Sequence, residues 1–306
     1  MARPASQLGP LRHVELRTAA PFDEIVDFYR TWGLDVVENT GTAIAFRGLG
    51  PAHHLVRFVA SQQPGLGHIA FAAPSRQAVD ALHRQWADAG VEIRLEPQML
   101  DALGGGYGFE VADPEGRALR VITEMIAADP RPPGPAVPVG ITHVVLNTVD
   151  IELLCAFYVE QLGFAVSDWS ERQMVFLRHG RDHHSIAFNQ AAHPSVNHVA
   201  YDLASLDHFL TAVGRMKAAG VEPLWGIGRH GPGNNCFAYY GDPAGFVPEY
   251  TADVQQIVDP DWVPRVWQRI PAQSDLWHLA GPPSPEFRRI GAGLPDPGLH
   301  SPRWPR

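Results

Sequence analysis

A short histidine-centred pattern occurs four times in this chain and limits the possible folds more than any other sequence feature. Each copy is a run of about six residues in which a histidine stands between apolar residues, as in a β-strand. The copies are residues 11–16, 66–71, 141–146 and 196–201, with His13, His68, His143 and His198 in third place. The histidines of each pair are 55 residues apart, and the pairs are 130 residues apart. The chain therefore consists of two homologous halves of two modules each.

The elements predicted after each histidine strand follow one order. Helices are predicted at residues 21–32, 75–89, 151–161 and 206–219, where apolar residues recur at helical spacing and glycine tends to follow. Strands follow each helix, with turns such as Asp113-Pro-Glu-Gly116 and Asp242-Pro-Ala-Gly245. This order predicts an α+β fold of four βαβββ modules, paired into two homologous half-open barrel domains.

Proline-rich segments mark the expected domain boundaries. Residues 129–139 are predicted to be a linker, because the prolines of Asp129-Pro-Arg-Pro-Pro-Gly-Pro135 cannot continue a helix or a central strand. Residues 1–128 and 140–258 are then the two domains. Residues 259–306 form a C-terminal extension that covers the surface or the active site. The part from Gly281 onward is rich in proline and is expected to be an extended tail.

Composition excludes several classes of partner. The formal net charge is −9, and no dense stripe of lysine and arginine occurs, so nucleic acid and anionic membranes are not expected as partners. No apolar run approaches the roughly 18 residues of a membrane span. The two cysteines, Cys155 and Cys236, do not suggest a disulfide framework and fit a reducing compartment. A cytoplasmic protein is expected.

The second half contains a candidate metal site. His143 and His198 occupy equivalent strands of paired modules, and Glu249 lies in the last strand of the fourth module. Two imidazoles and one carboxylate on one face of an iron form the facial triad of non-haem Fe(II) oxygenases. This set leaves three coordination positions open, which suits a ligand that binds through two oxygens together with O2.

The first half supplies an internal comparison. When the turns at Asp113 and Asp242 are aligned, Arg120 stands where the second half has Glu249. A guanidinium is always cationic and has no lone pair to offer a metal. The first domain is therefore predicted to be a metal-free copy in which His13 and His68 are structural remnants.

The segment Trp225–Asn235, together with Phe237–Gly245 and Pro248-Glu-Tyr250, resembles the active-site signature of the type I extradiol dioxygenases. These are the catechol 2,3-dioxygenase and dihydroxybiphenyl dioxygenase relatives of the vicinal oxygen chelate superfamily. The resemblance implies that the triad holds Fe(II), or occasionally Mn(II), and that the protein is a homo-oligomer. It also implies catalytic roles for three further residues, which are His184, His230 and Tyr239.

The three further residues suit the chemistry of ring cleavage, which requires a catechol to lose a proton and later needs a proton returned. His184 is predicted to face bound oxygen, and His230 and Tyr239 are predicted to hydrogen-bond the substrate oxygens. His183 precedes His184 in an expected strand and should therefore point outward. Three aromatic residues are suggested as pocket walls, and two arginines of the extension as partners for a substrate carboxylate: Phe176, Tyr201 and Trp225, with Arg265 and Arg269.

The predicted function is an extradiol dioxygenase that inserts both atoms of O2 into a catechol-type ring with meta cleavage, in the degradation of aromatic compounds. Its expected partners are a catecholic substrate and O2. One alternative is a glyoxalase-like isomerase or an epoxide-opening transferase, which use the same fold and similar ligands. Another is a non-catalytic protein that binds a small aromatic molecule.

Overall fold

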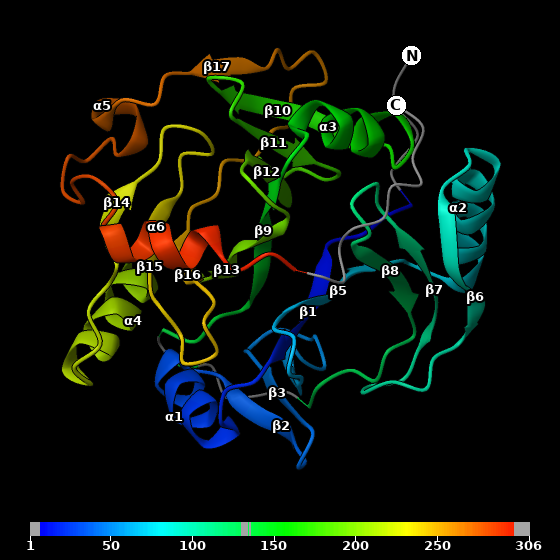
Figure 1. Cartoon of the computed structure of the whole chain (residues 1–306), viewed down its shortest axis with the longest axis horizontal. Coiled ribbons are helices and arrows are strands. Elements are labelled where there is room, and N and C mark those ends of the chain that lie inside the picture. The colour runs from blue at the N-terminus through cyan, green and yellow to red at the C-terminus, as the bar shows by residue number, and fades with distance from the viewer. Residues whose placement is uncertain (1–6, 130–133, 135, 297–306) are drawn as a thin grey trace.

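Two mixed β-sheets, one from each half, dominate the computed structural model, which describes residues 7–129, 134 and 136–296 (Figure 1). The first sheet has the strand order β2-β3-β4-β1-β5-β8-β7-β6. Its strands are β1 (Leu11–Thr18), β2 (Asp35–Asn39), β3 (Ala43–Arg47), β4 (Val56–Ala60), β5 (Gly65–Ala72), β6 (Glu92–Met99), β7 (Tyr107–Ala112) and β8 (Ala118–Thr123).

The second sheet repeats this order as β14-β15-β16-β13-β9-β12-β11-β10 and adds β17 at the edge. Its strands are β9 (Gly140–Thr148), β10 (Ala165–Ser170), β11 (Met174–Arg178), β12 (Ile186–Gln190), β13 (Ser195–Asp202), β14 (Trp225–Arg229), β15 (Cys236–Tyr239), β16 (Pro248–Ala252) and β17 (Arg265–Trp267). The predicted α+β fold of four βαβββ modules is confirmed. Each pair of modules joins into one open sheet.

The register of the central strands brings the histidines of a pair together. β9 and β13 are antiparallel neighbours, with His143 opposite Ala200 and Val145 opposite His198. Residues directly opposite each other share a face of the sheet, and so do residues two apart on one strand. Both imidazoles therefore project from the same face. β1 and β5 pair in the same way in the first half.

Four long helices begin and end within two residues of the predicted positions. They are α1 (Phe22–Trp32), α2 (Arg76–Asp88), α3 (Ile151–Glu160) and α4 (Leu206–Ala218). Three of them begin at residues whose side-chain oxygen accepts a hydrogen bond from a backbone N–H of the first turn, namely Ser75, Asp150 and Ser205.

The C-terminal extension is more structured than expected. After the short helix α5 (Pro271–Ser274), residues Pro285–Ala292 form helix α6, which packs against β13 (Figure 1). The expectation of an extended tail is therefore wrong for this part. Ser284 caps α6 and Pro285 occupies its first turn, where proline is tolerated. Residues 297–306 of the predicted tail, and residues 130–133 and 135 of the linker, lie outside the described residues.

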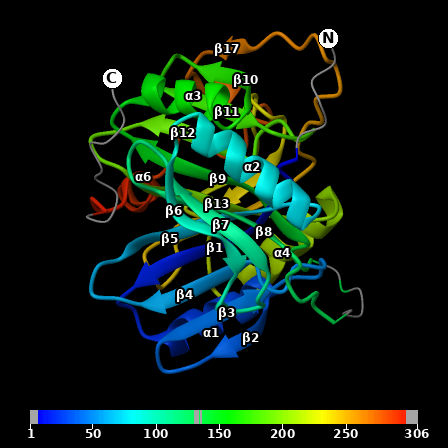
Figure 2. The same cartoon turned by 90° about the vertical axis from the view of Figure 1, so that its right-hand side faces the viewer.

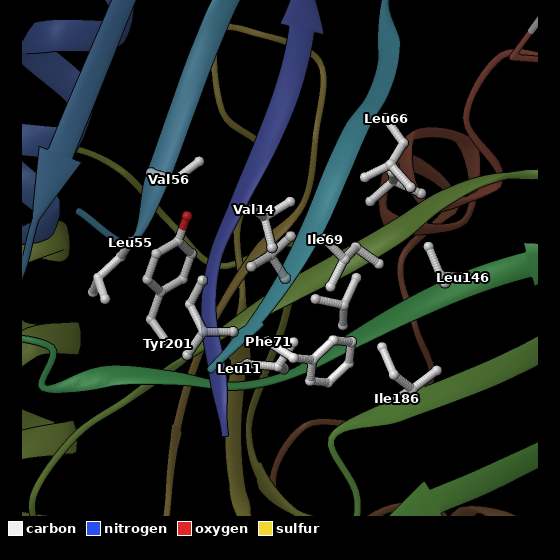
Figure 3. Close-up of a cluster of buried hydrophobic side chains, with 14 of the residues drawn as sticks. Leu11, Val14, Leu55, Val56, Leu66, Ile69, Phe71, Leu146, Ile186 and Tyr201 are labelled. Atoms are coloured by element: carbon white, nitrogen blue, oxygen red, sulfur yellow. The ribbon is translucent and has the colours of Figure 1, made fainter. Parts of the chain in front are cut away.

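The halves share a buried core in which the central strands of the two sheets cross (Figures 2 and 3). Val14 and Ile69 of the first sheet and Leu146 and Ile186 of the second belong to this apolar cluster. The long interface fixes one half against the other, so that α1 packs against α4. None of the helices in the described part of the chain is long and apolar enough to cross a membrane.

Candidate metal centre

The side chains of His143, His198 and Glu249 converge at one point on the second sheet. β16 lies beside β13 with Glu249 opposite Ala200, so the carboxylate shares the face of the two imidazoles. Nε2 of His143 is 3.1 Å from Oε2 of Glu249, and Nε2 of His198 is 3.2 Å from the same oxygen. All three residues are buried. The structure thus brings together three residues that are far apart in the sequence.

Hydrogen bonds to the outer nitrogens of the imidazoles orient both rings. Nδ1 of His198 is 2.8 Å from Oδ1 of Asn197, whose Nδ2 donates to Asn147. Nδ1 of His143 is 3.1 Å from the hydroxyl of Thr142, which donates to the carbonyl of Ala200. These partners can accept a proton from Nδ1, which leaves the Nε2 atom of each ring available to bind a metal ion. Neither Thr142 nor Asn197 was predicted, although both adjoin a ligand-type histidine in the sequence.

The carboxylate of Glu249 is held in its ionised form. Burial would raise the pKa of Glu249, but the adjacent imidazoles of His143 and His198 lower it to about 2. Nδ2 of the buried Asn235 lies 3.4 Å from the other carboxylate oxygen and donates more closely to Thr251. A buried carboxylate that lies against two Nε2 atoms suits a cation, which could bind all three groups in place of a shared proton.

The three residues fit a divalent transition metal. In octahedral coordination with bonds of about 2.1 Å, adjacent ligand atoms lie about 3 Å apart. The measured separations of 3.1 and 3.2 Å between the ligand atoms agree with this spacing. Two imidazoles and a carboxylate are the ligand set of the facial triad. Within the described part of the chain, this group meets the geometric requirement for a metal-binding cluster.

His184, which was predicted to be catalytic, lies beside the triad. Its ring centroid is 4.1 Å from that of His143, and it lines the cavity next to the triad. Burial lowers the pKa of His184 well below its ordinary value, so the imidazole is neutral near pH 7.

The expectation that His183 points outward is wrong. His183 is fully buried, and its Nδ1 is 3.0 Å from Nδ1 of His184. Both residues precede β12, which begins at Ile186, so the alternation of a strand does not apply to them.

His230 and Tyr239 form a hydrogen-bonded pair on another side of the cavity. Nε2 of His230 is 2.8 Å from the hydroxyl of Tyr239, and Nδ1 is 3.0 Å from the carbonyl oxygen of Ser274. A carbonyl only accepts, so Nδ1 carries the proton and Nε2 accepts from the phenol. Burial lowers the pKa of His230 to about 4, which keeps its imidazole neutral. Ser274, in the C-terminal extension, was not predicted as part of the site.

A cavity of about 500 Å³ opens beside the triad. The predicted wall residues Phe176 and Trp225 line it, but Tyr201 does not. Tyr201 instead packs against Trp32 of α1, because alternation along β13 turns it away from the face that carries His198. Tyr201 therefore belongs to the interface between the halves.

The C-terminal extension completes the cavity. Five of its residues that line the cavity come from β17, α5 and the segment between them: Trp267, Gln268, Arg269, Gln273 and Ser274. Phe287 and Arg288 of α6 line it as well. Of the two arginines suggested for a substrate carboxylate, Arg269 is among the lining residues and Arg265 is not.

The glycine-rich loop after β14 allows close approach. A Cβ at Gly231 would lie 2.4 Å from the carbonyl oxygen of Gln273 and 2.8 Å from the ring of Trp267. Gly233 has φ +80°, and a Cβ there would lie 3.2 Å from His184 and 3.3 Å from His183. Glycine at these positions lets the loop contact both the extension and the histidine pair.

Comparison with known proteins agrees with this geometry. Residues 11–121 and 140–250 each match the Glyoxalase/Bleomycin resistance protein/Dioxygenase superfamily. These two matches span most of the chain. The protein therefore belongs to this superfamily.

Three curated relatives have the names of ring-cleaving enzymes. Metapyrocatechase 2 of Cupriavidus necator is 32% identical over 155 residues, which are 49% of this chain and 47% of that protein. Metapyrocatechase of Geobacillus stearothermophilus is 24% identical and covers 96% of this chain and 93% of its own. The manganese-dependent 2,3-dihydroxybiphenyl 1,2-dioxygenase of Geobacillus genomosp. 3 is 24% identical, and the match covers 89% of this chain and 94% of that protein.

Two solved structures are similar along nearly the whole chain. The Mn(II)-bound glyoxalase from Novosphingobium aromaticivorans has a TM-score of 0.88 and 33% identity, and covers 97% of this chain and 99% of its own. Homoprotocatechuate 2,3-dioxygenase from Arthrobacter globiformis has a TM-score of 0.81 and 22% identity, and the match covers 94% of this chain and 92% of that protein. The resemblance to the type I extradiol dioxygenases is confirmed by the relatives together with the shared fold.

Proposed function

We propose that this protein is an extradiol dioxygenase that cleaves a catechol-type ring next to its diol, with O2 as the second substrate. One observation carries the proposal: a buried facial triad opens onto a cavity that holds two separate sets of proton-transfer groups. His184 lies beside His143, and the pair of His230 and Tyr239 lies near His198, since the rings of Tyr239 and His198 are 5.0 Å apart. The named ring-cleaving relatives support the same reaction.

His143, His198 and Glu249 would hold the metal in this proposal, and Fe(II) suits the reaction because O2 chemistry needs a redox-active ion. When bound, the ion supplies Lewis acidity toward the diol and a route for electrons between the diol and O2. Mn(II) is the second choice, and it is supported by two of the similar proteins. The domain of residues 1–128 is then a metal-free copy, and residues 140–258 form the catalytic domain.

Tyr239 and His230 are suited to take a proton from the diol. The phenol already donates its hydrogen to Nε2 of His230, so its oxygen presents lone pairs to the cavity. A diol hydroxyl placed against this oxygen can pass its proton to Tyr239 while the phenolic proton moves to Nε2 of His230. The resulting imidazolium of His230 is stabilised by the hydrogen bond from its Nδ1 to the carbonyl oxygen of Ser274.

His184 is suited to the later proton transfer. Breaking the O–O bond requires a proton at one of its oxygens, and a neutral imidazole can first accept a proton and then return it. The buried environment of His184 limits exchange of that proton with water. The aromatic walls Phe176 and Trp225 exclude water from the space where a ring would lie.

A glyoxalase-type isomerase is the second candidate, because the Mn(II)-bound glyoxalase has the higher TM-score of the two structures compared above and covers this chain almost completely. Isomerisation of a hemithioacetal needs a metal and one base but no O2. The second acid–base group beside the triad favours the dioxygenase. The two functions differ in whether O2 is consumed.

The deciding experiment loads the metal-free protein anaerobically with Fe(II) or Mn(II) and then adds O2 and a panel of catechols. We expect O2 uptake in equal moles with a yellow ring-opened product. A parallel arm supplies methylglyoxal with a thiol and follows hemithioacetal isomerisation. Isomerisation without O2 uptake on any catechol would establish the second candidate in place of the first.

A further inference from the structure

A chain of hydrogen bonds runs from the cavity into the protein through His184, His183 and Asp168. Nδ1 of His184 is 3.0 Å from Nδ1 of His183, and Nε2 of His183 is 3.1 Å from Oδ2 of Asp168. All three residues are buried, and among them the cavity reaches only His184. Asp168 lies in β10 and is not among the residues that line the cavity.

Asp168 sets the direction of every hydrogen bond in this chain. Its carboxylate also accepts from the indole Nε1 of Trp267 at 2.7 Å and from the backbone N–H of Arg265 at 2.8 Å. Burial would raise the pKa of Asp168, but these hydrogen bonds, led by that from His183, lower it, so the group is an anion near pH 7. An anionic carboxylate only accepts, so Nε2 of His183 must carry the proton.

The protonation of His183 also determines which nitrogen of His184 carries its proton. A neutral His183 with its proton at Nε2 has a lone pair at Nδ1, and this atom accepts from Nδ1 of His184. The proton of neutral His184 is therefore at Nδ1, and its Nε2 has a free lone pair. This is the tautomer that a proton acceptor facing the cavity needs.

The first half lacks this arrangement although it has the same residues at two of the three positions. His53 and His54 correspond to His183 and His184, and Glu38 in β2 corresponds to Asp168, with a bulge at the same place in both strands. Glu38 accepts from Nε of Arg57 at 2.7 Å. No hydrogen bond between Glu38 and His53 occurs among the described side chains.

One position explains why the two halves differ. Arg57 lies in β4 opposite Glu15 of β1. The matching residue in the second half is Ala187 of β12, which lies opposite Val145 of β9. Alanine provides no competing cation for Asp168, so this carboxylate is available to His183. The relay is therefore specific to the half that holds the facial triad.

We propose that Asp168 and His183 are positioning residues that hold His184 in the tautomer with its proton at Nδ1, so that Nε2 can accept and return a proton in the cavity. This inference deepens the proposed function and rests on it for its catalytic meaning. The tautomer itself is a property of the metal-free protein and can be measured without any activity.

The first test uses the metal-free protein labelled with 15N-histidine. Long-range 1H–15N correlation spectra at pH 8 distinguish a proton at Nδ1 from one at Nε2, and the His184 signals are identified by their loss in H184F. We expect His184 to be protonated at Nδ1 in the unmodified protein. Finding the proton at Nε2 would overturn the proposal.

Three variants separate the relay from a general structural effect. H183F removes the acceptor for Nδ1–H of His184, and D168A removes the acceptor for Nε2–H of His183. In both variants His184 should no longer favour the tautomer with its proton at Nδ1. D168N retains an oxygen that can accept from His183 and Trp267 together, so it should restore the Nδ1–H tautomer. If D168A does not fold, H183F alone decides, and an unchanged His184 tautomer in H183F refutes the relay.

The second test measures turnover of the metal-loaded protein with whichever catechol it accepts. Loss of a residue that orients a metal ligand by a hydrogen bond typically lowers activity about 10- to 100-fold. We expect D168A and H183F, which remove the residues that orient His184, to lower kcat by a similar factor, with KM and metal content nearly unchanged. In an H184F background, H183F should cause no further loss. E38A in the first half is the matched control and should change neither the His184 signals nor kcat.

The two tests distinguish failure of the relay from failure of the proposed function. If no catechol is turned over, the proposed function fails, while the spectra still decide the tautomer. If catechols are turned over but H183F retains full kcat, the relay has no role in catalysis and the inference is overturned.

Discussion

The two halves of this protein carry the same group of three histidines, yet they place different residues against it. His54 packs against His13 with ring centroids 4.2 Å apart, and His184 packs against His143 with ring centroids 4.1 Å apart. In the first half Nε2 of His13 meets Nε2 of His68 at 2.9 Å. There the two imidazoles hydrogen-bond each other directly, whereas in the second half both face a carboxylate.

The difference lies in one pair of opposite residues on neighbouring strands. Tyr239 stands opposite Glu249 in the second sheet, and Glu110 stands opposite Arg120 at the matching place in the first. Arg120 and Glu110 form an ion pair at 2.8 Å. The histidines therefore belong to the architecture of the module, whereas the chemistry depends on the residues that face them from the adjacent strands.

Removing the carboxylate should have the largest effect. We expect E249A to lose its bound metal and to lower turnover by about 10³-fold or more, because the ion contributes several kcal/mol to the transition state. Metal content by mass spectrometry and O2 uptake measure the two losses. The matched variant H13A in the first half should keep both, and a loss of metal from H13A would mean that the first half is not metal-free.

The acid–base pair should come next. H230Q and Y239F should lower kcat by roughly 100-fold, at the lower end of what general acid–base catalysis provides. Metal content should stay at the wild-type level, since neither side chain belongs to the triad. E110Q tests the matching position of the first half and should leave kcat unchanged. Wild-type kcat in both H230Q and Y239F would exclude a proton-transfer role for the pair.

The comparison can also be tested by gain of function. The double variant E110Y/R120E copies the second-half pair into the first half, where the two Nε2 atoms already lie 2.9 Å apart. We expect a second, weaker metal equivalent per chain, detected by titration with Mn(II) or Zn(II). R120Q removes the guanidinium without adding a carboxylate and should stay at one equivalent, and one equivalent in the double variant would show that more than these two residues was lost.

Much of the architecture could be predicted from the sequence because it is written as a repeat. The spacing of His13, His68, His143 and His198 indicated the paired modules, and Arg120 showed by its chemistry that the first site differs. Glu249 was grouped with His143 and His198 because it lies in the last strand of the fourth module, and the strand register places it on their face of the sheet. These inferences depend on residue identity and on strand register, which a repeat makes visible.

The surroundings of the site could not be predicted in the same way. His183 was expected to point away from His184, to the other face of the sheet or to the surface, because a strand was predicted there. The chain instead forms an irregular loop that buries His183 against Asp168. Ser274 contributes only its backbone carbonyl to His230, and a backbone group leaves no signal in residue identity. Trp267 reaches Asp168 across about a hundred residues, a contact that only the folded chain reveals.

A smaller contrast between the halves concerns the two matching turn aspartates. Asp113 is buried against the guanidinium of Arg117 at 3.0 Å, whereas Phe246 occupies the place of that arginine beside Asp242. Both aspartates accept a hydrogen bond from a tyrosine, Asp113 from Tyr158 at 3.3 Å and Asp242 from Tyr29 at 2.8 Å. Without an arginine beside it, Asp242 has a pKa that burial raises to about 7. The folded state thus holds the proton of Asp242 more tightly than the unfolded chain does.

The sign of the resulting pH dependence follows from this higher affinity for the proton. The contribution of Asp242 to stability is fully present below about pH 4 and is lost as the pH rises to about 7, by an amount on the order of 2–4 kcal/mol. D242N cannot ionise, so its unfolding free energy relative to wild type should increase between pH 5 and pH 8 in urea titrations of the metal-free protein. D113N should instead be less stable at both pH values, because it leaves the buried charge of Arg117 with Glu115 as its one remaining carboxylate partner of the two in the described structure. Equal pH dependence in D242N and wild type would show that Asp242 is ionised in the fold and that the absence of an arginine there has no electrostatic consequence.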